Sequence, residues 1–191
     1  IDCGYTPCDM VLFATTAAGK RALVNENAAY ELLGENVQPE DRTELPFKIR
    51  YALRIKDQGR LNPYLFVTGL AAVCKDKGTL IFEKTRVTQP PENDRLKVNG
   101  HTVTARNFVI ATHFPYINIP GLYFAKMFQS RSHNIVFHTR HKLFTDIYES
   151  AEANGFEYRA AEDGILCGGA HIRTGKYKYK SQYRIVEKHL T

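Results

Sequence analysis

The sequence predicts an α+β (mixed α/β) fold, built on a mixed β-sheet that carries helices on one face. Two apolar patterns lead to this class. The run MVLFAT at 10–15 predicts a short buried strand, and the alternating run RYALRI at 50–55 predicts a half-exposed one. Hydrophobic residues make up 43% of the chain and charged residues 24%, which are the proportions of a globular protein.

Helix start and stop signals flank these strands. Thr16 is a suitable N-cap for a helix, and Gly34 is the natural residue to end it. Asn62 and Pro63 form a second start signal, because Asn caps helices and Pro has the φ of a first helical residue. We expect this second helix to end at Gly78.

The middle of the chain is predicted to contain strands and one hairpin. Residues 79–89 (TLIFEKTRVTQ) are predicted to be a strand. Residues 95–99 and 101–105 pair naturally as a hairpin around Gly100. A strand over 103–112 follows directly.

The last third of the chain is predicted to return to a sheet and end in a helix. A short helix or extended turn comes first, at 122–128, and the tail from 178 to 190 is predicted to be helical. We expect Gly168 and Gly169 to end the last strand. The predicted strands lie at 134–139, 145–150, 156–159 and 165–167.

Composition limits the classes of protein that fit. No apolar run approaches the roughly 20 residues that span a bilayer, and nothing resembles a signal peptide. The four cysteines form no C-x-x-C pair, which argues against a zinc knuckle. A Cys3–Cys8 disulfide is an alternative to reduced thiols in a cytoplasmic protein, and we favour the reduced thiols. The net charge of +6 and the pI near 9.1 suit nucleic acid, an anionic cofactor or neither.

Two kinds of site have weak support in the sequence. The seven histidines lack a pattern such as H-E-x-x-H, so no metal site is expected. Residues 173–188 hold six Lys or Arg against one acid, interleaved with Tyr177, Tyr179 and Tyr183. Such a segment can form a nucleic-acid surface. We favour the alternative of a solvated helix face with its tyrosines packed inward.

Two segments are candidates for nucleotide chemistry. In VTARNFVIATHFPYINIPG (103–121) a strand ends at Ala111–Thr112, where a dinucleotide-binding sheet usually continues with glycine and this chain has His113. In GILCGGAHIRTGK (164–176) paired glycines precede basic residues, so a ligand or another backbone can approach closely. No G-x-G-x-x-G occurs in the 191 residues. Either 103–112 is an ordinary core strand, or the first half of a cofactor site lies outside this chain.

Taken together, four stretches resemble the FAD-dependent oxidoreductases of the D-amino-acid oxidase (glycine/sarcosine oxidase-like) superfamily, most closely the bacterial subgroup that is sometimes fused to a Rieske domain. The stretches are 45–71, 81–89, 103–133 and 163–177. The resemblance implies a substrate domain on a mixed sheet, plus strands of a truncated Rossmann-like FAD-binding domain. The chain then lacks the N-terminal G-x-G-x-x-G segment.

This resemblance implies three parts of the chain and a partial FAD site. The substrate domain comprises residues 1–78 and 122–191, and the second of these ranges includes a return segment to the FAD domain. The FAD-domain-like strands and the hairpin lie in residues 79–121. Three groups are expected to meet the cofactor, at its adenine end, its pyrophosphate side and its flavin ring. Arg86 and Val87 are expected at the adenine end. Ala111, Thr112 and His113 are expected at the pyrophosphate side, and Gly168, Gly169 and His171 at the flavin ring.

The resemblance also implies a substrate site and an activity. Arg159 and Arg173 are the candidates to meet a substrate carboxylate, and Tyr51 and Tyr123 to line the pocket. The full-length protein is expected to oxidise a C–N bond of a small amine or amino acid by hydride transfer to flavin. The fragment alone is expected to be inactive and to hold no FAD. A non-catalytic binding module and a basic nucleic-acid-binding protein are the alternatives, and no membrane partner is expected.

Overall fold

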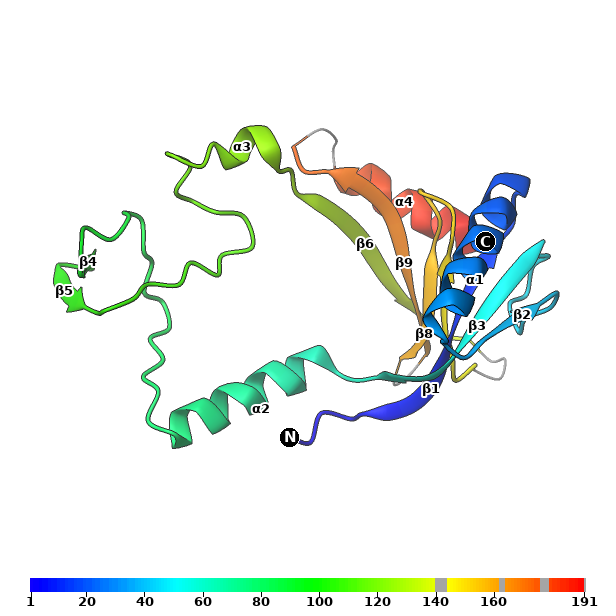
Figure 1. Ribbon diagram of the computed structural model, residues 1–191, viewed down its shortest axis with the longest axis horizontal. Helices are drawn as coiled ribbons and strands as arrows, with labels where there is room; N and C mark the ends of the chain where they lie inside the picture. The colour runs from blue at the N-terminus through cyan, green and yellow to red at the C-terminus, as the bar shows by residue number, and fades with distance from the viewer. Residues whose placement is uncertain (140–143, 162–163, 176–178, 191) are drawn as a thin grey trace. The chain divides into compact units, whose positions relative to one another are not determined.

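The structure is a computed structural model that describes all residues except 140–143, 162–163, 176–178 and 191 (Figure 1). It divides into two compact units. Unit 1 comprises residues 1–70 and 130–191, and unit 2 comprises residues 71–129. Each unit is described separately below.

Unit 1 is built on a seven-stranded mixed sheet, which confirms the predicted fold class (Figure 1). The strand order is β2-β3-β1-β7-β8-β9-β6. β1 and β7 are parallel, and the other neighbours are antiparallel. The strands are β1 Thr6–Ala14, β2 Val37–Glu40, β3 Tyr51–Arg60, β6 Ser130–Phe137, β7 Ile147–Ser150, β8 Glu157–Ala161 and β9 Gly164–Arg173.

The predicted caps of the first helix are confirmed. Helix α1 runs over Ala17–Leu33. The Thr16 side chain accepts a hydrogen bond from Gly19 N at 3.0 Å, and Gly34 ends the helix in the left-handed conformation with φ 72°. The final helix, α4 at Tyr179–Leu190, is also confirmed.

Helix α2, Pro63–Asp76, crosses the boundary between the two units. Its predicted start is confirmed, because Asn62 Oδ1 accepts from Tyr64 N at 3.0 Å and from Leu65 N at 3.2 Å. Both hydrogen bonds satisfy N–H groups that have no partner inside the helix.

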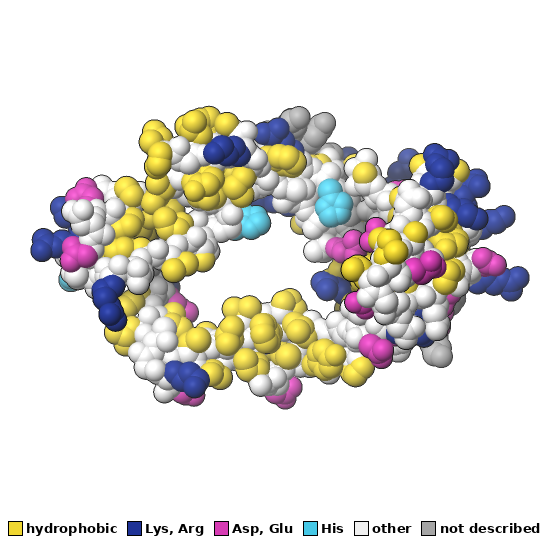
Figure 2. Space-filling model, in the orientation of Figure 1, with side chains coloured by type: hydrophobic (Ala, Val, Ile, Leu, Met, Phe, Trp, Pro, Cys, Tyr) yellow, Lys and Arg dark blue, Asp and Glu magenta, His cyan; other side chains and the backbone are white. Residues whose placement is uncertain are grey.

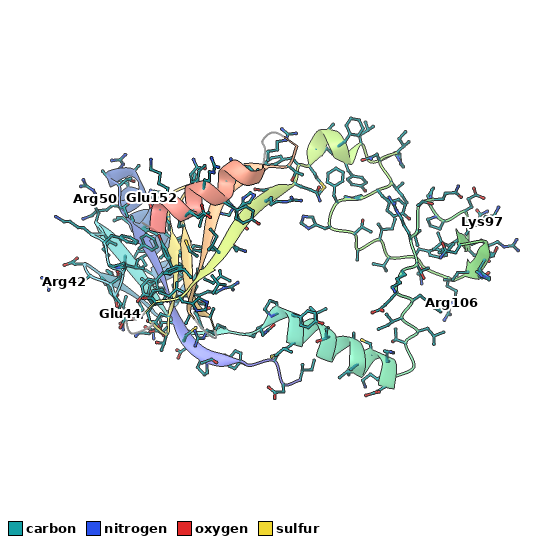
Figure 3. All side chains as sticks on the ribbon, turned by 180° about the vertical axis from the view of Figure 1, so that it is seen from behind. Arg42, Glu44, Arg50, Lys97, Arg106 and Glu152 are labelled. Atoms are coloured by element: carbon teal, nitrogen blue, oxygen red, sulfur yellow. The ribbon has the colours of Figure 1, made fainter. Side chains whose placement is uncertain are left out.

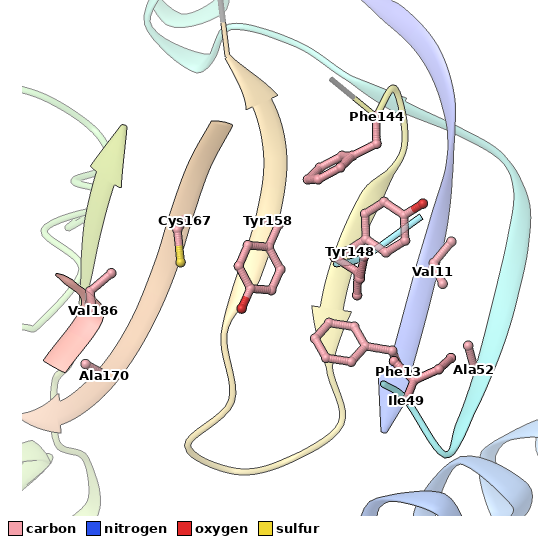
Figure 4. Close-up of a cluster of buried hydrophobic side chains, with 11 residues drawn as sticks. Val11, Phe13, Ile49, Ala52, Phe144, Tyr148, Tyr158, Cys167, Ala170 and Val186 are labelled. Atoms are coloured by element: carbon pink, nitrogen blue, oxygen red, sulfur yellow. The ribbon is translucent and has the colours of Figure 1, made fainter. Parts of the chain in front are cut away.

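Helices α1 and α4 of unit 1 lie on opposite faces of the sheet, not on one face as predicted. One apolar cluster joins Val11 and Phe13 of β1 to Val186 of α4 (Figure 4). A second cluster joins Ala14 of β1 to Leu23 of α1. Successive side chains of a strand point to opposite faces, so neighbouring positions of β1 contact different helices.

Three strand predictions for unit 1 need correction. β2 lies in a segment that was expected to be a polar loop, and it pairs with β3 through Val37–Glu40. β6 begins at Ser130, four positions before the predicted 134. β9 continues through Gly168 and Gly169 to Arg173, because β6 pairs with it from Ile165 to Arg173, while β8 pairs with it only as far as Gly168.

Unit 2 contains the last turn and a half of α2, a hairpin and the short helix α3 at Tyr123–Lys126. The hairpin is confirmed, with β4 at Arg95–Val98 and β5 at His101–Thr104. Asn99 and Gly100 both have positive φ, 50° and 80°, as a two-residue type I′ turn requires.

The predictions of long strands at 79–89 and 103–112, on either side of this hairpin, are wrong for this chain. Residues 79–89 form no strand, and of 103–112 only 103–104 belong to one. The apolar pattern is present, but a strand exists only where a neighbouring strand accepts its backbone hydrogen bonds. Unit 2 offers no such neighbour along these segments.

Candidate functional site

Three of the predicted cofactor residues come together in unit 2. Val87, Ala111 and Thr112 line one pocket of about 140 Å³. Its other lining residues are mainly apolar: Pro91, Leu96, Phe108, Val109, Ile110 and Tyr116. Two segments more than twenty residues apart in sequence therefore build one concave surface, which has the apolar character of small-ligand sites.

A tight turn borders this pocket. Phe114 N donates to Thr112 O at 2.7 Å, and the Thr112 hydroxyl donates to Phe114 O at 3.0 Å. His113, between them, has φ 64°, so this three-residue turn is of the rare γ form with positive φ. A positive φ is the conformation that glycine adopts most easily, and this chain has a histidine in it.

The other predicted residues of this group lie outside the pocket. Arg86 is exposed and does not line it. His113 is exposed as well and borders the pocket only through Thr112. The described residues thus form an apolar recess lined by two hydroxyl-bearing residues, Thr112 and Tyr116, and the expected cation is not part of it.

The glycine pair of β9 lies at an irregular position of the sheet of unit 1. His133 of β6 is opposite Gly169, and Arg131 is opposite Ile172, so β9 has one residue more than β6 between these pairs. In this bulge Ala170 has φ 49°. His133 Nδ1 lies 3.3 Å from Ala170 O, and the exposed His171 follows.

Packing alone accounts for the glycine at position 169. A Cβ there would lie 2.5 Å from Phe156 Cδ1 and 3.1 Å from Gly155 O, and φ is 156°. A Cβ on Gly168, which is buried, would meet side chains instead, 2.3 Å from Glu157 Oε1 and 2.5 Å from Asn134 Oδ1. Neither glycine faces open space, but the side chains around Gly168 can shift more easily than the Gly155 backbone beside Gly169.

The three predicted substrate residues of unit 1 do not lie together, and the fourth belongs to unit 2. Tyr51, at the start of β3, packs in the cluster under α1, and the Lys20 ammonium lies 5.5 Å from its ring centre. Burial, with Glu31 and Asp41 nearby, raises the pKa of Tyr51. Arg159 is exposed on β8, which β1 and β7 separate from β3. The remaining two are both exposed, Arg173 at the end of β9 and Tyr123 in α3 of unit 2.

A larger aromatic pocket in unit 1 was missed by sequence reasoning. It measures about 380 Å³, and Phe47, Phe144, Tyr158 and His189 are among its lining residues. The Tyr158 hydroxyl contacts His189 Nε2, and the His189 ring stacks on Phe156 with centroids 3.8 Å apart. Burial lowers the pKa of His189 and raises that of Tyr158. No sequence motif links these residues, because they come from three distant segments.

The basic segment 173–188 falls partly on α4. Within the described part, Val186 and Gln182 are buried, and Tyr183 packs edge-on against His133 with centroids 5.0 Å apart. Tyr177 lies outside the described residues, and so does the side chain of Tyr179. The described part of α4 therefore packs on the sheet through Val186 and Gln182, whereas Tyr183 stays 45% exposed and is not packed fully inward as expected.

Metal and membrane sites have no support in the part of the chain that the structure describes. No group of three or more His, Cys, Asp or Glu side chains is placed to hold a metal ion there. No described helix has both the length and the apolar character needed to cross a bilayer. The four cysteines are free, so the alternative Cys3–Cys8 disulfide does not form.

The fold and these sites place the chain in a known class of protein. The family model for FAD-dependent oxidoreductases, DAO, matches residues 1–190, and the chain belongs to this family. This confirms the resemblance seen in the sequence.

Individual relatives agree with the family. The chain is 25% identical over 190 residues to a protein of Bacillus subtilis (strain 168) provisionally named as a Rieske 2Fe-2S iron-sulfur protein, YhfW. Glycine oxidase from Geobacillus kaustophilus has a similar fold, with a TM-score of 0.78 and 17% identity over 100% of this chain. L-proline dehydrogenase from P. horikoshii gives a TM-score of 0.77 and 16% identity over 99% of it.

The chain spans only part of each relative. It covers 37% of the Bacillus subtilis protein, 55% of the glycine oxidase and 56% of the proline dehydrogenase. The residues present fit FAD only in part. The pocket of unit 2 suits an apolar portion of the cofactor, but the 191 residues contain no Gly-rich turn for its pyrophosphate.

Proposed function

We propose that this chain is part of an FAD-dependent oxidoreductase that oxidises a C–N bond of a small amine or amino acid. The match of the family model to residues 1–190 carries the proposal. Two structural neighbours are named for amino acids, glycine oxidase and L-proline dehydrogenase, which supports this substrate class. Bound FAD supplies the hydride acceptor for such a reaction.

In this proposal unit 2 belongs to the FAD-binding side. Its pocket encloses an apolar part of the cofactor against Val87 and Ala111, and the Thr112 hydroxyl orients a polar group at the edge. The turn at His113 holds the backbone close to the same edge. Arg86 is exposed and long enough to pair with an anionic group of the cofactor.

Unit 1 belongs to the substrate side. Backbone N–H groups of the bulge at Gly169–His171 are proposed to face negative charge on the reduced flavin ring. Arg159 and Arg173 are exposed cations suited to a substrate carboxylate. Tyr51 and Tyr123 are proposed to line the substrate pocket of the complete protein. Free cysteines fit a reducing cytoplasm as its compartment.

The proposal is tested on the full-length protein. The purified protein is expected to be yellow, with the two visible absorption bands of oxidised flavin, and to lose them when a suitable amine or amino acid is added without oxygen. A full-length protein that neither carries nor binds FAD contradicts the proposal. The isolated 191-residue chain is expected to be colourless, and equilibrium dialysis that shows stoichiometric FAD retention would refute this second expectation.

The arginine assignments have their own test. Arg159→Gln and Arg173→Gln are expected to raise KM for a carboxylate-bearing substrate by about tenfold or more, because one charge-assisted hydrogen bond is worth about 1.5–3 kcal/mol. Arg106→Gln is the matched control, since Arg106 is an exposed arginine of unit 2 outside the proposed substrate site. If an arginine variant has the same KM as the control variant, the assignment of that arginine to the substrate site is wrong.

A further inference from the structure

The aromatic pocket of unit 1 takes no part in the proposed reaction. Its volume of about 380 Å³ lies in the range of about 300–1,000 Å³ that is typical of small-molecule sites. Tyr158 of β8 lines the pocket and belongs to the cluster under α4, whereas the next residue, Arg159, is a proposed substrate contact. Successive side chains of a strand point to opposite faces of the sheet. The pocket therefore lies on the other face of the sheet from Arg159.

Aromatic rings form much of the wall of this pocket. Four of them are described, from Phe47, Phe137, Phe144 and Tyr158. The centroids of Phe47 and Tyr158 lie 5.9 Å apart at an interplanar angle of 52°. Phe144 and Tyr158 are buried and belong to the cluster drawn in Figure 4. The face of an aromatic ring carries partial negative charge, so these rings attract cations as well as apolar groups.

The formal charge among the described lining residues is also negative. It belongs to Glu44, and no Lys or Arg is present among these residues. Glu44 is exposed, so its carboxylate lies on the solvent side of the pocket, where the hydroxyl of the buried Tyr148 donates to Oε2 at 3.4 Å. The other polar lining residues are His138, Thr139 and His189.

His189 does not oppose a positive ligand at pH 7. Burial lowers its pKa below the ordinary value of 6.5, and Nε2 contacts the Tyr158 hydroxyl, so the ring is neutral. Cations of unit 1 gather elsewhere, at the α1 end that Figure 2 shows with many Lys and Arg side chains. Lys20, Arg21 and Arg50 line a separate concave surface there, on the face of the sheet opposite to α4.

We propose that the aromatic pocket binds a small organic ammonium ion with an aromatic body. The body packs among the rings of Phe47, Phe144 and Tyr158, and the ammonium group lies towards Glu44. A cation gains attraction both from the ring faces and from the carboxylate, whereas a neutral molecule of the same shape gains only the apolar contact. An anion is repelled by Glu44. The site goes beyond the proposed function, because neither flavin nor the proposed substrate residues form part of it.

Isothermal titration calorimetry of the full-length protein at pH 7 tests the ligand class. The probe is phenethyltrimethylammonium, whose quaternary nitrogen has no lone pair to support hydride loss, so binding is separate from turnover. We expect saturable one-to-one binding, at least threefold tighter than that of the neutral phenethyl alcohol. Absence of saturable binding overturns the proposal, and so do equal affinities for the two compounds. A full-length protein that binds the probe but carries no flavin supports the site and contradicts only the proposed function.

Two variants locate the binding site. Glu44→Gln is expected to weaken probe binding about two- to fivefold, because an exposed carboxylate contributes modestly, and to leave phenethyl alcohol binding unchanged. Phe47→Leu keeps an apolar side chain without the ring and is expected to weaken probe binding about threefold. The matched controls are Glu149→Gln, at an exposed position of β7, and Phe82→Leu, at a position of unit 2 that is exposed by 72%.

The controls are expected to bind the probe as the wild type does. Tyr148 belongs to the cluster under α4, so its neighbour Glu149 points to the other face of the sheet. Wild-type affinity in Glu44→Gln refutes the assignment of the ammonium position, and wild-type affinity in Phe47→Leu refutes the aromatic wall. Because Glu44 is exposed, its variant tests the site even if Phe47→Leu proves unstable.

Discussion

Glu152 caps helix α1 from a distant part of the chain, and its replacement gives a direct test of the fold. Glu152 Oε1 accepts from Thr15 N at 2.9 Å, from Thr16 N at 3.0 Å and from the Thr16 hydroxyl at 3.1 Å. Its other oxygen accepts from the Ser150 hydroxyl at 2.5 Å. Arg50 donates to Thr15 O at 3.0 Å at the same helix start, and Figure 3 labels both Arg50 and Glu152.

The expected magnitude follows from these contacts. Hydrogen bonds to a charged group are worth about 1.5–3 kcal/mol each, but water partly replaces them at an exposed helix start. Glu152→Ala is therefore expected to lower the free energy of unfolding by about 2–3 kcal/mol. At about 2–4 °C per kcal/mol for a chain of this size, the melting temperature falls by about 4–12 °C.

The pH dependence of the same variant gives a second readout. Burial acts to raise the pKa of Glu152, but the hydrogen bonds from Ser150, Thr16 and Thr15 outweigh it, and the pKa lies below its ordinary value of 4.5. The stabilisation is fully present above pH 4.5 and is lost as the pH falls through the lowered folded-state pKa. The difference between wild type and Glu152→Ala should therefore shrink in acid.

Thermal unfolding followed by circular dichroism between pH 3 and pH 7 measures both effects. Glu149→Ala is the control, since Glu149 is an exposed glutamate at β7, three residues before Glu152. Equal melting temperatures for the two variants at pH 7 would refute the capping argument, as would a difference that stays constant down to pH 3.

Three further predictions concern other parts of the structure. Arg54→Met leaves the carboxylates of Glu40 and Asp146, each 2.5 Å from the guanidinium, without their cation, and should cost about 3 kcal/mol in urea denaturation; a loss below 1 kcal/mol contradicts this. Gly169→Ala forces a Cβ towards Phe156 and should cost about 2 kcal/mol or more, whereas Gly168→Ala should cost less. His113→Val should be about 1–2 kcal/mol less stable than His113→Gly, because a β-branched residue is disfavoured at φ 64°; equal urea midpoints would disprove the strained turn.

The sequence could group candidate site residues only where they share a segment or a recurring pattern. Val87, Ala111 and Thr112, which were assigned together to a cofactor, line one pocket, and their role in binding it stays a prediction. The aromatic pocket around Tyr158 and His189 could not be predicted, because its members approach one another only when β8 and α4 are packed.

The sequence by itself determined the features that depend on local hydrogen bonds. Thr16 and Gly34 mark the ends of α1, Asn62 starts α2, and Asn99–Gly100 turns the hairpin. Each of these signals depends on hydrogen bonds within a few residues, so it can be recognised in the sequence before any tertiary contact is known.

Only the tertiary structure decided how these elements are used. It set β1 parallel to β7, placed α1 and α4 on opposite faces and brought Glu152 to the start of α1. It also showed that the strand-like segment 79–89 stays unpaired in this chain. A β-strand forms only when a second segment pairs with it, because its backbone hydrogen bonds need a partner on a neighbouring segment.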